Sequence, residues 1–289
     1  MKPNFFIVGT PKAGTTSLYH YLDEHPEIFM SPIKETNYFS YEEIKSQGLF
    51  YKEEHISSFN QYEDQFKDAQ GEKAIGEASV SYLYYPSVPF KIKDFNPGAK
   101  IIIVLRNPVD RGFSHYLMDK RLEFVNLSYE DIVWQRTKHP HSKLYYQQYV
   151  LLGQYYEQVK RYLTAFGEKQ VKILFYEDTL KDIKNVIREL YTFLKVDCTF
   201  SPDTDQQHNV YSSPKNVFIQ KLYAQKKIRT IAKKLFGENI QHQLKNHFFR
   251  KDKPVLNEQL KLDLIGIYKE NVYKTSDLLK KDLTCWLHP

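Results

Sequence analysis

The sequence is poor in cysteine and lacks a long apolar run. Its 289 residues include only Cys198 and Cys285, whose separation matches neither a metal-ligand pair nor a disulfide framework. This scarcity favours a reducing compartment over secretion. No stretch approaches the roughly 20 apolar residues that cross a bilayer, and no secretory leader pattern precedes the first apolar run. We therefore expect a soluble, cytoplasmic protein without an integral membrane segment.

A strong excess of one charge sign is also missing. The chain has 41 Lys and Arg against 35 Asp and Glu, a net charge of +6, which suits an anionic ligand but does not indicate nucleic acid. The basic residues concentrate in 215–253, where eleven Lys and Arg stand against two acidic residues. We interpret this stretch as a helical segment that either faces solvent or meets an anionic acceptor. The 23 tyrosines suit stacking on a sugar or base and equally suit an aromatic core.

Short apolar runs alternate with helical patterns along the chain. Buried strands are expected at 5–8, 74–78, 101–105 and 171–176, because such runs bounded by turn residues are typical of parallel sheets, while residues 31–70 show no regular pattern. The helical segments are 15–24, a helix that begins at Asn107 and Pro108, 145–166, the stretch after 176 as far as 194, and 256–279. This alternation predicts a three-layer α/β fold, with a central parallel sheet flanked by helices, in one domain over 1–289.

The stretch G-T-P-K-A-G-T-T-S at 9–17 joins the first expected strand to the first expected helix. Its glycines allow a tight turn, and Thr15, Thr16 and Ser17 bring hydroxyls to a helix N-terminus, where backbone N–H groups attract an anion. Thr15 occupies the place at which a kinase-type P-loop has its lysine, and Lys12 lies three residues earlier. The stretch therefore predicts a phosphate cradle of another kind, with a plain capped turn as the alternative.

Arg106 provides a second expected anion contact. It follows the apolar run 101–105, at the carboxyl end of a strand, where open α/β sheets bind ligands. Ser114 lies eight residues later on the next helix, and an arginine fork with a hydroxyl suits a terminal phosphate. A salt bridge from Arg106 to Asp110 is the alternative. A metal-dependent nucleotidase would need an aspartate at such a strand end, so this pattern argues against Mg-ATP hydrolysis.

These segments together resemble the PAPS-dependent sulfotransferases, in particular the glycosaminoglycan N- and 3-O-sulfotransferase branch and its bacterial relatives. The matching stretches are P-K-A-G-T-T-S at 11–17, I-V-L-R-N-P-V-D-R-G-F-S-H-Y at 103–116, L-F-Y-E-D-T-L at 174–180 and L-T-C-W at 283–286. The resemblance implies a P-loop NTPase-like sulfotransferase fold, PAPS (3′-phosphoadenosine 5′-phosphosulfate) as co-substrate, PAP as product and no metal.

The resemblance also implies roles for individual residues. Lys12 would neutralise the leaving 5′-phosphate, and Arg106 with Ser114 would hold the 3′-phosphate. Tyr176 would lie close to the nucleotide, and Lys215 would belong to a loop that closes over it. The 5′-phosphate would be held by the stretch Ala13, Gly14, Thr15, Thr16 and Ser17.

The same branch uses a glutamate base in a segment like K-E-x-H-F-F, which corresponds to K-E-T-N-Y-F at 34–39. The resemblance thus implies Glu35 as the base, although Asn37 replaces a supporting histidine and Ser40 replaces a frequent aspartate. A salt bridge to Lys34 in a solvated loop is the alternative for Glu35. Glu77 matches a family position near the acceptor and is expected to bind it. The lesser candidates for the base are His20 and His115.

The predicted reaction is in-line transfer of a sulfuryl group to a hydroxyl or amine, most simply on a carbohydrate. The glutamate base, the aromatic content and the basic segment favour a saccharide, and a small alcohol, phenol or natural product is the alternative acceptor. Two other classes compete with this interpretation: a P-loop kinase or NTPase, and a non-catalytic module that binds a nucleotide or glycan. The sequence does not indicate an oligomeric state.

Overall fold

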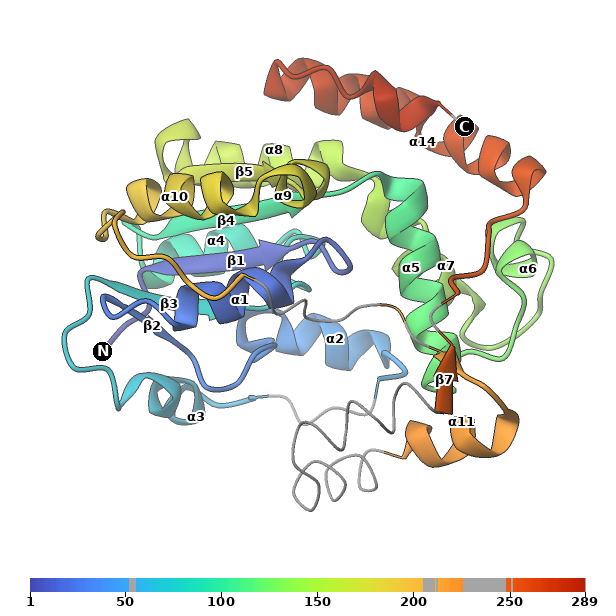
Figure 1. Cartoon of the computed structure of the whole chain (residues 1–289), viewed down its shortest axis with the longest axis horizontal. Helices are drawn as coiled ribbons and strands as arrows, with labels where there is room; N and C mark the ends of the chain where they lie inside the picture. The colour runs from blue at the N-terminus through green and yellow to red at the C-terminus, as the bar shows by residue number, and fades with distance from the viewer. Residues whose placement is uncertain (52–55, 205–210, 212, 226–247, 251, 289) are drawn as a thin grey trace.

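The computed structural model describes residues 1–289 except 52–55, 205–210, 212, 226–247, 251 and 289. At its centre is a five-stranded parallel sheet in the order β2-β3-β1-β4-β5 (Figure 1). A second, antiparallel pair of very short strands joins β6 to β7. The strands are β1 (Phe5–Gly9), β2 (Ile28–Met30), β3 (Ala74–Ala78), β4 (Lys100–Leu105), β5 (Val171–Phe175), β6 (Ser213–Pro214) and β7 (Phe249–Arg250).

Helices connect the strands and cover both faces of the central sheet (Figure 1). The α-helices of the described residues are α1 (Thr15–Asp23), α2 (Tyr41–Gln47), α3 (Phe59–Glu63), α4 (Val88–Phe95), α5 (Pro108–Arg121), α6 (Tyr129–Val133), α7 (Ser142–Tyr149), α8 (Tyr155–Phe166), α9 (Tyr176–Lys181), α10 (Ile183–Leu194), α11 (Val217–Ala224) and α14 (Glu258–Leu279). The 3₁₀ turns are η1 (Tyr38–Ser40), η2 (Asp64–Phe66), η3 (Leu151–Gly153), η4 (Glu168–Gln170) and η5 (Thr284–Leu287).

Two apolar cores lie on opposite faces of the sheet, because successive side chains of a strand point to opposite sides. Ile7 and Ile102 enter the core that also contains the buried residues of α1 and α10. Phe6 and Ile103 enter the larger core, which contains the buried residues of α4, α8 and α14. The sheet is therefore covered on both sides, and the expected three-layer α/β fold is confirmed.

The expected strands agree with β1, β3, β4 and β5 to within one residue at each end. Asn107 caps α5 as expected: its Oδ1 accepts from the backbone N–H of Val109 at 3.0 Å and of Asp110 at 3.4 Å. The strand β2 has only three residues, too few for an apolar pattern, and it was not expected. The stretch 31–70, expected to be irregular, contains η1, α2, α3 and η2.

The expectation of one helix over 145–166 is wrong. The chain forms α7, turns through η3 and starts again at α8. At Gly153 in this break, an added Cβ would lie 2.9 Å from the Tyr268 ring and 3.0 Å from the Cβ of Pro108. The break thus lets α14 and the start of α5 approach the backbone closely, a tertiary demand that helical periodicity does not contain.

The helix expected after the fifth strand is also divided. Asp182 separates α9 from α10, and its side chain accepts a hydrogen bond of 3.0 Å from the backbone N–H of Asn185. An aspartate that caps a new helix favours such a boundary over a continuous helix. The division leaves α9 as a short helix directly after β5.

The carboxyl ends of β1, β3, β4 and β5 meet at one edge of the sheet, since the strands are parallel. In Figure 1, α5 and α7 stand beyond the edge toward which these strands point. The residues that follow the strands are therefore brought together there. Within the described part of the chain, no helix combines the length and the apolar character that crossing a membrane requires.

Candidate active site

A cavity of about 830 Å³ opens at this edge of the sheet. Its walls come from the β1–α1 loop, the segment before η1, the ends of β4 and β5, and one face of α5. The structure thus brings together most of the residues expected at the site. Those that line the cavity are Lys12, Gly14, Thr15, Thr16, Ser17, Glu35, Arg106, Ser114 and Tyr176.

The β1–α1 loop presents an open helix N-terminus to the cavity. Gly14 is the N-cap of α1, with a left-handed φ of 84°, and it provides no side-chain bond to the first N–H groups. The first turn also contains no acidic residue. Because the first N–H groups of a helix have no partner within the helix, an anion is the complementary ligand at this position. An added Cβ on Gly14 would lie 3.2 Å from the Tyr176 ring, so a larger residue would crowd the turn.

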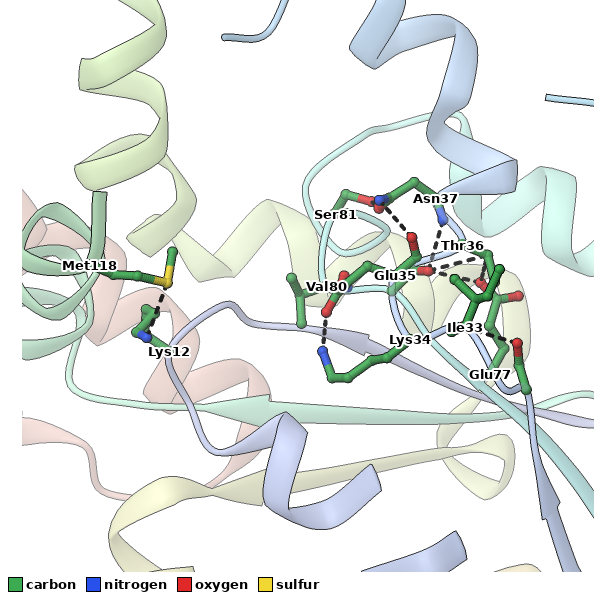
Figure 2. Close-up of polar contacts among 12 residues, drawn as sticks. Lys12, Ile33, Lys34, Glu35, Thr36, Asn37, Glu77, Val80, Ser81 and Met118 are labelled. Atoms are coloured by element: carbon green, nitrogen blue, oxygen red, sulfur yellow. Dashed lines mark hydrogen bonds and ion pairs between the residues drawn. The ribbon is translucent and has the colours of Figure 1, made fainter. Parts of the chain in front are cut away.

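Lys12 projects from the same loop into a group of cations. Its Nζ lies 3.4 Å from Met118 Sδ, and no described carboxylate forms an ion pair with it (Figure 2). Burial, with the nearby positive charge of Arg121 as the next largest cause, lowers the pKa of Lys12 to about 8; Asp119 opposes this shift. The ammonium is thus poorly compensated in the free protein, and a bound anion would stabilise its charged form.

Arg106 is oriented by the loop and by the end of β5. Its Nη1 donates to the Lys12 carbonyl at 2.7 Å, and its guanidinium stacks over the Tyr176 ring at 4.4 Å from the centroid. The hydroxyl of Tyr155 donates to the Arg106 carbonyl at 2.8 Å. The alternative salt bridge with Asp110 does not occur among the described residues, where Arg106 contacts the loop and the tyrosine ring instead. The Arg106 side chain is thus fixed by the β1–α1 loop through the Lys12 carbonyl and by the ring of Tyr176.

Helix α5 contributes a polar face that the sequence reasoning found only in part. Ser114 lies on this face, and Arg121 also lines the cavity seven residues later, two helical turns along. Arg121 was not among the expected site residues. The signal was present in the sequence, because a spacing of seven from a binding serine places a second residue on the same face.

Glu35 stands across the cavity from Lys12 at the start of the turn before η1 (Figure 2). Its backbone is left-handed, with φ of 67°, and its N–H donates to the Ala78 carbonyl at 2.8 Å. One carboxylate oxygen accepts from the Val80 backbone N–H at 2.8 Å, and the other pairs with the Lys34 ammonium. The side chain is 26% exposed, so a ligand can reach it. The structure contains the Lys34 pair that was the alternative interpretation, but on a carboxylate that faces the cavity.

The two residues that depart from the family pattern hold the same turn. Asn37 donates from Nδ2 to the Glu35 carbonyl at 3.1 Å, and Ser81 Oγ donates to Asn37 Oδ1 at 2.6 Å. Ser40 Oγ lies 2.8 Å from Ser81 Oγ. The turn is thus tied to the segment after β3 by side-chain hydrogen bonds. Asn37 lines the cavity without contacting the Glu35 carboxylate.

Glu77 lies on β3 and is fully buried, so it does not reach the cavity. The expected contact with the acceptor is therefore corrected, because a carboxylate without exposed surface cannot touch a ligand. Burial raises the pKa of Glu77, while hydrogen bonds from hydroxyls, with Thr36 first, oppose this shift.

Three further expected positions lie away from the cavity surface. The Ala13 side chain is buried in the core of α1, which leaves only its backbone to meet a ligand. Lys215 is exposed and does not line the cavity; its backbone N–H donates to the Phe248 carbonyl at 2.9 Å. His20 also lies outside the lining. Most of the basic segment 215–253 lies outside the described residues, but Lys253 at its end lines the cavity.

His115, the other lesser candidate, belongs to the cavity wall and is only 4% exposed. Its Nε2 lies 2.9 Å from the Tyr51 hydroxyl and its Nδ1 3.2 Å from the Gln148 carbonyl. Burial, with the nearby Arg111 as the next cause, lowers its pKa well below the usual value. A neutral, doubly hydrogen-bonded imidazole is therefore expected, which suits a packed residue better than the base.

The chain has an α/β fold of the P-loop-like kind, and its cavity brings together a strand-to-helix loop and an arginine. The chain belongs to the sulfotransferase family: the family model of the sulfotransferase domain matches residues 2–275. A sulfotransferase from Alicyclobacillus acidocaldarius is 30% identical, with a TM-score of 0.74 over 100% of both chains.

Curated relatives include two larger proteins. The chain is 28% identical to carbohydrate sulfotransferase 15 of Mus musculus over 67% of its own length. It is 27% identical to the bifunctional heparan sulfate N-deacetylase/N-sulfotransferase 3 of Homo sapiens, also over 67%. These matches span 44% and 22% of the relatives, respectively, so the chain corresponds to less than half of each.

Proposed function

We propose that this protein transfers the sulfuryl group of PAPS to a hydroxyl or amine of a carbohydrate, with Glu35 as base and PAP as product. The observation that carries the proposal is one cavity with two opposed sides. Lys12 and the uncapped start of α1 form one side, where no described carboxylate pairs with the Lys12 ammonium, and the Glu35 carboxylate forms the other. The family membership supports the sulfuryl chemistry.

The residues present fit such a nucleotide. The open N-terminus of α1, with the hydroxyls of Thr15 and Thr16, would hold the 5′-phosphate. Arg106 and Ser114 would hold the 3′-phosphate through a guanidinium fork and a hydroxyl. Tyr176 lies under the Arg106 guanidinium and would meet the nucleotide there. Lys253 replaces Lys215 in this proposal as the basic residue at the cavity.

The proposed step has a simple atom balance. As the acceptor oxygen or nitrogen bonds to sulfur, the bond between sulfur and the bridging oxygen of the 5′-phosphate breaks, and the electron pair leaves with PAP. Glu35 accepts the proton of the acceptor. Lys12 and the first N–H groups of α1 stabilise the charge that develops on the leaving phosphate. Alignment of donor and acceptor in one cavity provides the remaining advantage.

A carbohydrate acceptor is supported by two observations. Both larger relatives bear names that refer to carbohydrate or heparan sulfate. Tyrosines also line the cavity beyond the phosphate loop, and aromatic faces suit a sugar ring. Ile44, Leu49 and Phe124 line the same part, which keeps a small alcohol, phenol or natural product as the alternative. The two exposed, unpaired cysteines fit a reducing compartment, and we propose a cytoplasmic location on that ground.

The test combines binding and turnover. Thermal unfolding of the purified chain is expected to shift upward with PAP and much less with Mg-ATP, because a ligand of the native state stabilises it. Incubation with PAPS and a panel of acceptors, namely a glycosaminoglycan oligosaccharide, p-nitrophenyl β-glucoside and p-nitrophenol, is expected to release PAP. Stronger stabilisation by Mg-ATP would favour a kinase, and tight PAP binding without PAP release from any acceptor would favour a binding module.

A further inference from the structure

The described residues contain a buried carboxylate that the proposed reaction does not use. Glu77 has no exposed surface and accepts hydrogen bonds from four hydroxyls. Ser79 Oγ donates at 2.8 Å and the Tyr82 hydroxyl at 2.6 Å, while Thr36 Oγ1 and the Tyr62 hydroxyl also donate to it. Thr36, Ser79 and Tyr82 donate to one carboxylate oxygen, Oε1, and Tyr62 donates to the other, Oε2, so both oxygens have hydrogen-bond partners.

The hydroxyls of this cluster also face the turn that carries Glu35. Ser79 Oγ accepts from the Asn37 backbone N–H at 3.0 Å, and the Tyr82 hydroxyl accepts from the Phe39 backbone N–H at 3.2 Å. A hydroxyl has a single hydrogen, so its donation to Glu77 leaves its oxygen lone pairs directed at these N–H groups. Thr36 is itself part of the turn and follows Glu35 directly. The carboxylate thus determines the direction in which each hydroxyl points.

The turn needs such support because its backbone is unusual. Glu35 has φ of 67° and Asn37 has φ of 52°, and both lie in the left-handed region that non-glycine residues seldom adopt. Residues in this region persist where their surroundings over-determine them. Figure 2 shows Glu77 behind the turn, on the side away from Lys12, with Thr36 between Glu77 and Glu35.

We propose that Glu77 is a positioning residue for the base: through the hydroxyls of Thr36, Ser79 and Tyr82 it holds the Glu35–Asn37 turn and so directs the Glu35 carboxylate into the cavity. The inference rests on the proposed function, in which Glu35 accepts the proton. Glu77 touches neither the cavity nor the Glu35 side chain, so its effect passes through the backbone of the turn.

The first test is a double-mutant cycle with Glu77→Gln and Glu35→Gln. Glutamine keeps the shape but lacks the negative charge, so the hydrogen bonds that Thr36, Ser79 and Tyr82 all donate to Oε1 lose their charge assistance. With the panel acceptor that gives the fastest PAP release, Glu77→Gln is expected to lower kcat by about 30-fold and to change the Kd for PAP by less than twofold. In the Glu35→Gln background the same change is expected to lower kcat by less than threefold, because residues that act through one another are not additive.

The two ways of failing are distinct. Full turnover by Glu35→Gln would refute the base assignment and, with it, the inference. A large loss in Glu35→Gln, followed by a further 30-fold loss in the double variant, would overturn the inference alone, since Glu77 would then act independently of the base.

A second pair of variants covers the case in which Glu77→Gln does not fold. Tyr82→Phe removes a hydroxyl that joins Glu77 to the turn, whereas Tyr62→Phe removes one that donates to Glu77 and, among the described residues, has no hydrogen bond to the backbone of the turn. Both delete one buried hydroxyl from the same carboxylate, and Tyr82→Phe is expected to lower Tm somewhat more because it also removes the acceptor of the Phe39 N–H. Only Tyr82→Phe is expected to lower kcat, by about tenfold against less than threefold for Tyr62→Phe. Equal losses in kcat would overturn the inference.

Hydrogen exchange provides a readout that needs no acceptor. In Tyr82→Phe the backbone N–H groups of Phe39 and Val80 are expected to exchange at least tenfold faster than in the wild-type protein, while those of α1 keep their rates. Unchanged exchange at Phe39 and Val80 would show that the turn does not depend on this cluster, and it would overturn the inference.

Discussion

The two sides of the cavity are built in different ways. The Lys12 side is formed by secondary structure itself: a strand end, a glycine turn and an uncapped helix, with a cation whose one hydrogen-bond partner among the described residues is a thioether. The Glu35 side is formed by side chains from distant parts of the sequence, and its polar groups are already bonded to one another. In the proposed function the first side gains its partner when the nucleotide binds, whereas the polar groups of the second side are hydrogen-bonded without a ligand.

This difference separates binding from chemistry. An anion site made of helix N–H groups and a cation retains part of its affinity when one element is removed, because its donors act side by side. A base must be in one place with one orientation, so its geometry needs many contacts to hold it.

The largest effect is expected for Glu35→Gln. Loss of the proton acceptor is expected to lower kcat by about 10³-fold, which is typical of general bases, while the Kd for PAP changes less than twofold. Single-turnover PAP release and calorimetric PAP titration measure the two quantities. Glu63→Gln, which lies at the end of α3 outside the cavity lining, is the matched control and should keep wild-type kcat. If kcat of Glu35→Gln stayed within tenfold of the wild-type value, Glu35 would not be the base.

Lys12→Met is expected to have the next largest effect. Removal of the cation beside the leaving phosphate should lower kcat/KM by about 10²-fold. The Tm of the free protein should stay equal or rise, because the variant removes a poorly compensated charge from a group of cations. Lys172→Met, on an exposed ion pair with Glu189, is the control. A drop in Tm with unchanged kcat/KM would mean that Lys12 serves the fold.

Arg106→Lys tests the contact with the 3′-phosphate. Lysine keeps the charge but lacks the fork, so PAP binding should weaken by about 30-fold, equivalent to about 2 kcal/mol. Binding of adenosine 5′-phosphate, which lacks the 3′-phosphate, should weaken far less. Ser114→Ala is also expected to weaken binding of PAP more than binding of adenosine 5′-phosphate, but by a smaller factor than Arg106→Lys. Equal weakening for both nucleotides would place Arg106 at another part of the ligand.

The smallest expected effects are on the pH dependence of the free energy of unfolding and on proton uptake when PAP binds. Lys12 has a folded-state pKa of about 8, below its usual value, so between pH 8 and about 10 the unfolded chain binds a proton that the folded chain has released. The free energy of unfolding of the ligand-free protein should therefore rise over this window, relative to Lys12→Met. PAP binding should take up a proton near pH 8 to 9, measurable by calorimetry in buffers of different ionisation enthalpy. Proton-neutral binding in this range would contradict a lowered pKa of Lys12.

Sequence reasoning succeeded where local chemistry decides the outcome. Strand β4, the capped start of α5 and the glycine turn that begins α1 were all predicted, since each depends on residues adjacent in the chain. It failed where distant segments decide. The helix breaks at Gly153 because Tyr268 packs closely against the backbone there. Glu77 was expected to touch the acceptor, but it lies in the interior, where four hydroxyls donate hydrogen bonds to it.

The sequence by itself determined the α/β order of elements, the glycine turn with Lys12 between the first strand and the first helix, and the family resemblance, because glycine turns, apolar runs and helix caps act over a few residues. Only the tertiary structure decided that Lys253 joins the cavity and that Lys215 does not line it. It also decided how the Glu35 turn is held, through hydrogen bonds that reach more than forty residues along the chain to Glu77, Ser79 and Tyr82. Such contacts depend on which strands lie side by side in the sheet, which no local pattern specifies.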